Sequence, residues 1–287
     1  MKVMITGANG FIGSPLVKEI IKRGHSVCSA VRKNDAEDKA TSQAENVEIG
    51  EIGPQTDWLN SLKSVEVIVH LAAVTHQKAL SNDESLFKQV NIDGTKRLLE
   101  DAIRSGVKRF IFISSIKVYG EKRTQNGFLN RNAETPEILD EESKVGLGCD
   151  SYGLSKLIAE NEIQKLCQQS SIEFVIIRPP LVYGPNVGAN FKSLLALINT
   201  GIPLPFAGIN NRRSMIAIDN IVDFICCCVI AKKAANQVYL ISDDDDISLS
   251  RLISLSRRSM NIRARLFFTP ISAVSYTHLR AHETVLD

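Results

Sequence analysis

Two features that define other protein classes are missing from this sequence: a surplus of charge of one sign and a long hydrophobic run. The 34 basic and 32 acidic residues leave a formal net charge of +2, so we expect neither nucleic acid nor a membrane as a partner. A helix that spans a bilayer needs about 20 apolar residues. The longest candidate, Ile221–Ala231, is shorter and contains Asp223, which argues against a membrane-embedded chain.

Cysteines at metal-binding or redox spacing are also missing. The six cysteines include no Cys-x-x-Cys pair, and Cys226–Cys228 form a run inside an apolar helical pattern. This context favours buried free thiols over a metal site, so we expect no bound metal. It also favours a reducing, cytoplasmic compartment. Met1–Thr6 is typical of a first core strand, and we therefore expect no signal peptide.

What the sequence does contain is an alternation of strand-like and helical segments. With 287 residues, of which 44% are hydrophobic, the chain can bury a large core. The strand-like segments are apolar on both faces, as in parallel sheets covered by helices. The alternation predicts an α/β fold with a Rossmann-type, doubly wound parallel sheet. The predicted strands are 2–6, 26–31, 47–49, 65–71, 109–114 and 173–178, and the predicted helices are 14–23, 84–105 and 151–169.

The pattern changes after Pro179-Pro180, where turn signals cluster and the elements become shorter. We therefore predict a dinucleotide-binding domain over residues 1–178 and a smaller C-terminal α/β substrate lobe, interleaved and truncated, over 179–273. The polar segment 121–148 is predicted to be a surface loop beside the site. The lobe is predicted to contain helices 190–199, 220–232 and 248–259 and strands 214–218, 238–242 and 263–268.

The last residues, 274–287, have a different character. Val274–Thr284 resembles an in-frame translation of a transposase-type sequencing-library adapter. We therefore expect the natural sequence to end near Ala273, and we assign the tail no part in fold or function. For this reason His278 and His282 are not taken as metal ligands, although they stand four residues apart.

Three glycines between the first strand and the first helix predict a phosphate-binding loop. Gly7 allows a tight turn, Gly10 lets the backbone approach a phosphate closely, and Gly13 lets the helix pack near the strand. The N-terminus of the helix would then offer N–H groups and a positive dipole end to a pyrophosphate. Because a strand precedes and a helix follows, as this motif requires, we predict dinucleotide binding rather than a simple glycine-rich turn.

Ser115, Tyr152 and Lys156 form a candidate catalytic set. Tyr152 and Lys156 share one face of a predicted helix, and Ser115 follows the end of a predicted strand. A lysine cation beside a phenol favours phenolate and lowers its pKa. Tyr152 could then exchange a proton with a carbonyl or alkoxide oxygen during hydride transfer, while Ser115 holds the same oxygen. An isolated Tyr-x-x-x-Lys is often only an exposed pair, but here it accompanies a glycine loop.

The chain resembles extended short-chain dehydrogenases/reductases, in the group of nucleotide-sugar epimerases, dehydratases and reductases. The resemblance extends over nearly all of residues 1–273. The segments that carry it are Thr6–Gly13, His70–Ala73, Asn91–Thr95, Ser114–Gly120, Tyr152–Lys156 and Arg178–Pro185.

This resemblance implies roles for further residues. It implies that Ser115 contacts the substrate, that Asn190 and Arg213 hold the diphosphate of a UDP-linked sugar, and that the chain forms a homodimer through two helices. The cofactor contacts that it implies are Gly7, Asn9, Gly10, Phe11, Ile12, Gly13, Arg32, Glu51, Ile52, Leu71, Ala72, Ala73, Lys156, Pro179 and Val182.

Two departures from the pattern narrow the predicted reaction. Dehydratases of this group carry Asp-Glu directly after the catalytic hydroxyl, whereas this chain has Ile116 and Lys117, so we do not expect dehydration. An acidic residue at the end of the second strand would bind the ribose 2′-hydroxyl of NAD. Here Arg32 and Lys33 follow that strand and suit a 2′-phosphate. We therefore expect NADP(H), with NAD(H) possible if both side chains are only solvent-exposed.

These observations lead to one principal hypothesis and two alternatives. The principal one is an NADPH-dependent reductase of a 4-keto UDP-sugar in the synthesis of surface-polysaccharide precursors. Segments Ser114–Val118, Gly201–Phe206 and Asn211–Ser214 resemble a subgroup that reduces UDP-4-keto-6-deoxy-N-acetylhexosamines. The first alternative is a UDP-hexose 4-epimerase with bound NAD. The second is a non-catalytic dinucleotide-binding regulator.

Overall fold

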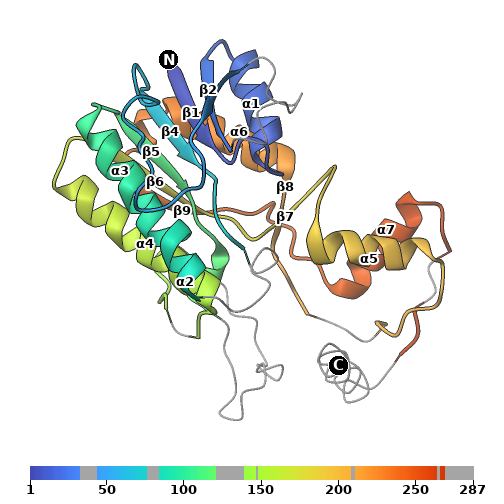
Figure 1. The fold of residues 1–287 in the computed structure, drawn as a ribbon. Coiled ribbons are helices and arrows are strands. Elements are labelled where there is room, and N and C mark those ends of the chain that lie inside the picture. Colours follow the sequence, from blue (N-terminus) through green and yellow to red (C-terminus); the bar gives the residue numbers. More distant parts are fainter. Residues whose placement is uncertain are drawn as a thin grey trace. The chain divides into compact units, whose positions relative to one another are not determined.

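The computed structural model describes residues 1–32, 44–75, 84–120, 139–146, 148–207, 211–263 and 266–268. The chain divides into two compact units (Figure 1). Unit 1 comprises Met1–Asn186 and Ile216–Ser242, and unit 2 comprises Val187–Met215 and the chain from Asp243 onwards. Lys33, most of the predicted loop 121–148 and the whole tail 274–287 lie outside the described residues.

Unit 1 is built on a seven-stranded sheet in which all neighbouring strands pair in parallel, in the order β3-β2-β1-β4-β5-β6-β9. The chain adds strands outward from β1 to β3, then returns to the other side of β1 with β4. This reversal makes the β1–β4 boundary the topological switch point, where such sheets bind ligands. The strands are β1 Lys2–Thr6, β2 Ser26–Val31, β3 Glu45–Glu48, β4 Val67–His70, β5 Arg109–Ile113, β6 Glu173–Arg178 and β9 Gln237–Leu240.

Helices cover both faces of the sheet, α1 and α6 on one side and α2, α3 and α4 on the other (Figure 1). Alternate residues of β1 belong to different cores: Val3 packs on the α1 and α6 side, and Met4 on the α3 and α4 side. Apolar residues on both faces of each central strand therefore produce two apolar layers. The elements are α1 Gly13–Lys22, α2 Glu84–Phe87, η3 Lys88–Gly94, α3 Thr95–Arg104, η4 Ile116–Tyr119, α4 Ser151–Gln168, α6 Ile218–Ile230 and η5 Lys232–Ala234.

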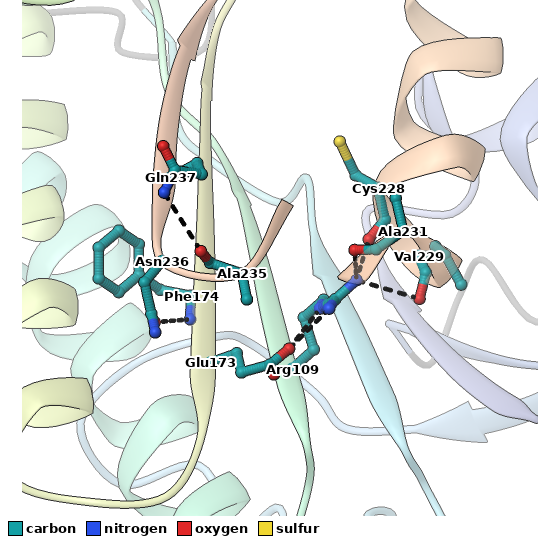
Figure 2. A network of polar contacts seen from close by, with 9 residues as sticks. All are labelled: Arg109, Glu173, Phe174, Cys228, Val229, Ala231, Ala235, Asn236 and Gln237. Carbon is teal, nitrogen blue, oxygen red and sulfur yellow. Dashed lines mark hydrogen bonds and ion pairs between the residues drawn. The ribbon is translucent and has the colours of Figure 1, made fainter. Parts of the chain in front are cut away.

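A buried arginine attaches the end of α6 to the sheet (Figure 2). Arg109, at the start of β5, donates from Nη1 to the carbonyl oxygens of Cys228 (2.6 Å) and Ala231 (2.9 Å). Its Nε and Nη2 donate to Oε2 of Glu173 at the start of β6 (2.9 and 2.6 Å). The last carbonyl groups of a helix have no partner within it, and Arg109 supplies donors for them.

Unit 2 contains α5 Ala189–Asn199 and α7 Leu249–Ser259. Its small core holds Ile198, Leu204 and Ile253. The short strands β7 Leu181–Tyr183 and β8 Met215–Ala217 pair in a separate two-stranded sheet near the division between the units. No helix among the residues described here is long and apolar enough to cross a membrane.

The doubly wound parallel sheet is confirmed, but several details differ from the prediction. The single helix predicted over 84–105 is three segments, α2, η3 and α3, because η3 is a π-helical turn. The strand predicted over 263–268 is, in its described part, only a bridge between Leu204 and Leu266. The predicted lobe 179–273 also included α6 and β9, which pack in unit 1. Neither β7 nor η4 was predicted.

Candidate active site

The glycine loop lies at the switch point. Gly7 follows β1 with φ +70°, and a Cβ there would lie 3.0 Å from the backbone nitrogen of Ala72, which follows β4. The turn is closed by a hydrogen bond from Gly10 N to Gly7 O (2.9 Å). Glycine suits position 7 for two reasons: the backbone is in the left-handed region, and the segment that follows β4 leaves no room for a side chain.

Gly13 begins α1 in direct contact with the loop. A Cβ at Gly13 would lie 2.1 Å from Gly7 O and 2.8 Å from the Cα of Ala8. Both obstacles are backbone atoms, so only glycine lets the helix start this close to β1. No side chain caps α1, and its N-terminal turn is therefore suited to an anion.

A buried histidine links the two strands that border the switch point to α3. His70 Nδ1 lies 2.7 Å from Oγ1 of Thr6, and Nε2 lies 2.9 Å from Oγ1 of Thr95. Thr6 Oγ1 also accepts from Ala72 N (3.2 Å). A neutral ring with its proton on Nε2 satisfies all three contacts. The pKa of His70 is lowered to about 3, mainly by burial and to a smaller extent by the charge of Lys156.

The residues expected to contact the cofactor lie mostly after the carboxyl ends of strands. Arg32 follows β2, and its Nη1 lies 3.8 Å from Oε1 of Glu51, with both side chains largely exposed. The partly buried Ile52 packs on the α3 and α4 side of the sheet. Asn9 lies in the glycine loop, Ala72 and Ala73 follow β4, and the buried Pro179 follows β6. Four further positions are partly buried against the core on the α1 and α6 side: Phe11, Ile12, Leu71 and Val182.

The structure places the three predicted catalytic residues on neighbouring elements of unit 1. Ser115 caps η4, and its Oγ accepts from Lys117 N (3.2 Å). Tyr152 lies in the first turn of α4, and Lys156 follows one turn later with only 2% of its surface exposed. Asp150 caps α4, because its Oδ1 accepts from Gly153 N (2.7 Å).

The expected lowering of the phenol pKa is wrong for this structure. The pKa of Tyr152 is raised to about 12, mainly by burial and to a smaller extent by the nearby charge of Asp150. Burial lowers the pKa of Lys156 to about 7, although Glu160 opposes this change. The Lys156 ammonium donates to the carbonyl oxygen of Ile113 (2.9 Å). Desolvation therefore outweighs the attraction that the sequence argument assumed.

Asn91 links the chain after β4 to α4, a contact that was not predicted from the sequence. It lies in the π-helical turn η3, 1% exposed. Its Oδ1 accepts from Val74 N (2.8 Å), and its Nδ2 donates to Val74 O (3.0 Å) and to Ser155 Oγ (3.0 Å). Ser155 Oγ in turn donates to Tyr152 O (2.7 Å). The segment Asn91–Thr95 was among the family-like motifs, but it carried no signal of this function.

The two residues expected to hold the sugar diphosphate belong to unit 2, whereas the predicted catalytic residues belong to unit 1. Asn190 is in the first turn of α5. The exposed Arg213 exchanges backbone hydrogen bonds with Ile247 (3.2 and 3.1 Å). Their role stays a prediction. Within the described ranges, no three His, Cys, Asp or Glu side chains are grouped so that they could hold a metal ion.

A doubly wound parallel sheet with a glycine loop at its switch point is the fold of the short-chain dehydrogenase/reductase class. The chain belongs to the NAD dependent epimerase/dehydratase family, whose model matches residues 3–242. It is thus an enzyme of a family that acts on nucleotide sugars, and the resemblance noted from the sequence is confirmed.

Individual relatives agree with this assignment. A protein named UDP-glucose 4-epimerase from Vibrio cholerae is 43% identical over 256 residues, which cover 88% of this chain and 73% of that relative. A second relative, from Escherichia coli O157:H7, is 28% identical, and the match covers 90% of this chain and 72% of that relative. It is named N-acetyl-alpha-D-glucosaminyl-diphospho-ditrans,octacis-undecaprenol 4-epimerase. UDP-glucuronic acid 4-epimerase from Bacillus cereus, solved with UDP-glucuronic acid and NAD, has the same fold, with a TM-score of 0.77 and 24% identity. The match covers 93% of this chain and 86% of that protein.

Proposed function

We propose that this enzyme inverts the configuration at C4 of a UDP-hexose and keeps NAD bound throughout the reaction. The observation that carries the proposal is the presence, in one unit, of the glycine loop and of Ser115, Tyr152 and Lys156 on adjoining elements. The relatives support the choice of reaction, because two of them are named as 4-epimerases. The fold neighbour that holds a UDP-sugar and NAD supports the choice of substrate class.

The glycine loop fits a dinucleotide. Side chains at Gly7, Gly10 or Gly13 would strike backbone atoms at 3.0 Å or less, so the loop offers main chain rather than side chains to a ligand. No side chain caps the following helix. Both features suit a pyrophosphate. When bound, a nicotinamide would supply the acceptor and donor of the hydride at C4.

The protein side chains handle the proton. Tyr152 is the group that would take the proton from the O4 hydroxyl as the sugar is oxidised and return it after the sugar has turned. Ser115 would donate a hydrogen bond to the same oxygen. Because burial lowers the pKa of Lys156 to about 7, this lysine can change its protonation state near neutral pH and assist Tyr152.

A second candidate reaction is supported by Arg32. In this candidate the enzyme uses external NADPH to reduce a 4-keto UDP-sugar, with Tyr152 as the acid. Arg32 follows β2 where NAD-binding sheets carry an acidic residue, and it is 53% exposed. Its contact with Glu51 is 3.8 Å long between two exposed groups, a pair weak enough to give way to a 2′-phosphate.

Cofactor stoichiometry separates the two reactions. The purified chain is mixed with UDP-glucose, and the appearance of UDP-galactose and the absorbance of reduced cofactor are followed together. We expect UDP-glucose and UDP-galactose to interconvert without a net change in reduced cofactor. The Tyr152→Phe variant should lose this interconversion. A parallel sample receives UDP-4-keto-6-deoxy-N-acetylglucosamine with NADPH or NADH. Loss of NADPH equal to the substrate added, without interconversion of UDP-hexoses, would instead establish the reductase.

A further inference from the structure

Lys117 connects the two elements that carry Ser115 and Tyr152. Its backbone N–H donates to Ser115 Oγ (3.2 Å). Its side chain extends to the start of α4, where Nζ donates to Oδ2 of Asp150 (2.5 Å). The same ammonium lies 5.9 Å from the centroid of the Tyr152 ring. One residue of η4 therefore contacts the catalytic hydroxyl and the cap of α4, and its charge faces the catalytic phenol.

The start of α4 is built around this contact. Asp150 uses one carboxylate oxygen to cap α4 through Gly153 N (2.7 Å) and the other to bind Lys117. A Cβ at Gly153 would lie 2.5 Å from Lys117 O, so the helix rests directly on the backbone of η4. The position of Tyr152 therefore depends on how firmly Lys117 and Asp150 hold these two segments together.

We propose that Lys117 is a positioning residue for proton transfer at Tyr152, because its pairing with Asp150 cancels the negative charge two residues before the phenol and fixes the start of α4 against η4. The charge of Asp150 raises the pKa of Tyr152 in addition to the larger effect of burial. A cation on that carboxylate reduces the penalty for forming phenolate. The inference deepens the proposed function and rests on it in one respect, that Tyr152 is the group that exchanges the proton.

The other charges near Tyr152 lie on several elements packed against α4, and η3 among them carries Lys88 and Asp93. On α4 itself, Lys156 follows one turn later, and the cap Asp150 precedes. On α2, Glu84 accepts from Ser151 Oγ (3.3 Å). Arg178 of β6 and Lys96 of α3 form ion pairs with Glu160 (2.6 Å) and Glu162 (3.0 Å) of α4. Lys117 pairs with Asp150, whose charge adds to the effect of burial on the pKa of Tyr152.

A direct titration of the phenol tests the proposal without any sugar. The full chain is labelled with ¹³Cζ-tyrosine, NAD is added, and the resonance that Tyr152→Phe removes is followed with pH. Lys117→Met should raise the apparent pKa of Tyr152 by about 0.5–1, while the matched control Lys117→Arg should leave it within about 0.2. Asp150→Asn keeps a capping side chain but removes the charge, and in that background Lys117→Met should have little further effect.

Each result of the titration either supports or overturns the role proposed for Lys117. The proposal is overturned if Tyr152 has the same pKa in the wild type and in Lys117→Met. It is also overturned if Lys117→Met raises the pKa of Tyr152 as much in the Asp150→Asn background as in the wild type. A fall in melting temperature with no change in the titration would reduce Lys117 to a structural contact and also overturns it. Absence of UDP-hexose interconversion in the wild-type chain would refute the proposed function, yet it leaves the titration results intact, so the two failures are distinguishable.

Discussion

His70 is held as a neutral ring in the interior of unit 1, and this makes the fold sensitive to acid. Its pKa is lowered to about 3 by burial, whereas an unfolded histidine titrates near 6.5. The folded state therefore resists a proton that the unfolded state accepts, so stability is full above about pH 6.5 and is lost as the pH falls from there toward 3. Between pH 7 and 4.5 we expect a loss of about 2–3 kcal/mol from this group.

Urea unfolding at several pH values measures this loss, and His70→Gln is the control. Glutamine keeps a donor and an acceptor toward Thr6 and Thr95 but does not titrate. The variant should start less stable at pH 7 and then lose about 2–3 kcal/mol less than the wild type on going to pH 4.5. Parallel curves for the two proteins would mean that other groups, and not His70, set the acid sensitivity.

Gly13 has almost no room for a side chain. Its added Cβ would lie 2.1 Å from Gly7 O, and a backbone atom cannot rotate aside. We expect Gly13→Ala to destabilise the chain by about 1–3 kcal/mol and to weaken NAD binding at least tenfold. Isothermal titration with NAD measures the affinity, and Gly188→Ala, where an added Cβ meets nothing within 4 Å, should bind NAD as the wild type does.

The placement of Tyr152 and Lys156 on one helix was predictable, but their electrostatics were not. The Tyr152 and Lys156 spacing is local, and a helix places both on one face whatever surrounds it. Their pKa values depend on burial and on Asp150 and Ile113, which are determined by packing between distant segments. Mutual attraction within the pair alone would lower the pKa of the Tyr152 phenol, which is the opposite of the direction that burial gives it.

At the scale of the elements, the junction of α6 with β5 depends on the side chain of Arg109. Arg109 supplies donors to Cys228 O and Ala231 O and is paired with Glu173 (Figure 2). Its side chain is 8% exposed. Arg109→Met keeps the apolar stem but leaves buried carbonyl groups without these donors, so we expect a loss of about 2–4 kcal/mol in the free energy of unfolding, measured by chemical denaturation.

The matched variant Glu173→Gln separates the ion pair from the helix contact. The Glu173 side chain is 40% exposed, and glutamine can still accept a hydrogen bond from Arg109, so we expect a cost below about 1 kcal/mol. If Glu173→Gln proved as harmful as Arg109→Met, the charge pair rather than the end of α6 would be the important part.

The strands of the central sheet were predictable because their hydrophobic runs are short, rich in Val, Ile and Phe, and regularly spaced. The π-helical turn at Lys88–Gly94 was not, because the periodicity of 84–105 suits an ordinary helix and the turn is stabilised by Asn91 contacts with Val74 and Ser155. The assignment of β9 also failed, since a strand of four residues carries no signal of the sheet that it joins.

At the scale of the whole molecule, the residues expected to contact ligands belong to two different units. The glycine loop and Tyr152 lie in unit 1, whereas Asn190 and Arg213, which we expect to hold the sugar diphosphate, lie in unit 2. A ligand slows hydrogen exchange in the segments that it stabilises. Hydrogen exchange should therefore detect the cofactor and the nucleotide separately.

We expect NAD alone to slow exchange in peptides that cover the glycine loop and the end of β4. UDP alone should slow exchange around Arg213 and Ile247, whose backbones are hydrogen-bonded to each other. Arg213→Ala removes the guanidinium that would bind the diphosphate, so it should abolish the UDP effect and leave the NAD effect unchanged. Protection by UDP confined to unit 1, or persisting in Arg213→Ala, would remove Arg213 from the substrate site and leave the glycine loop assignment standing.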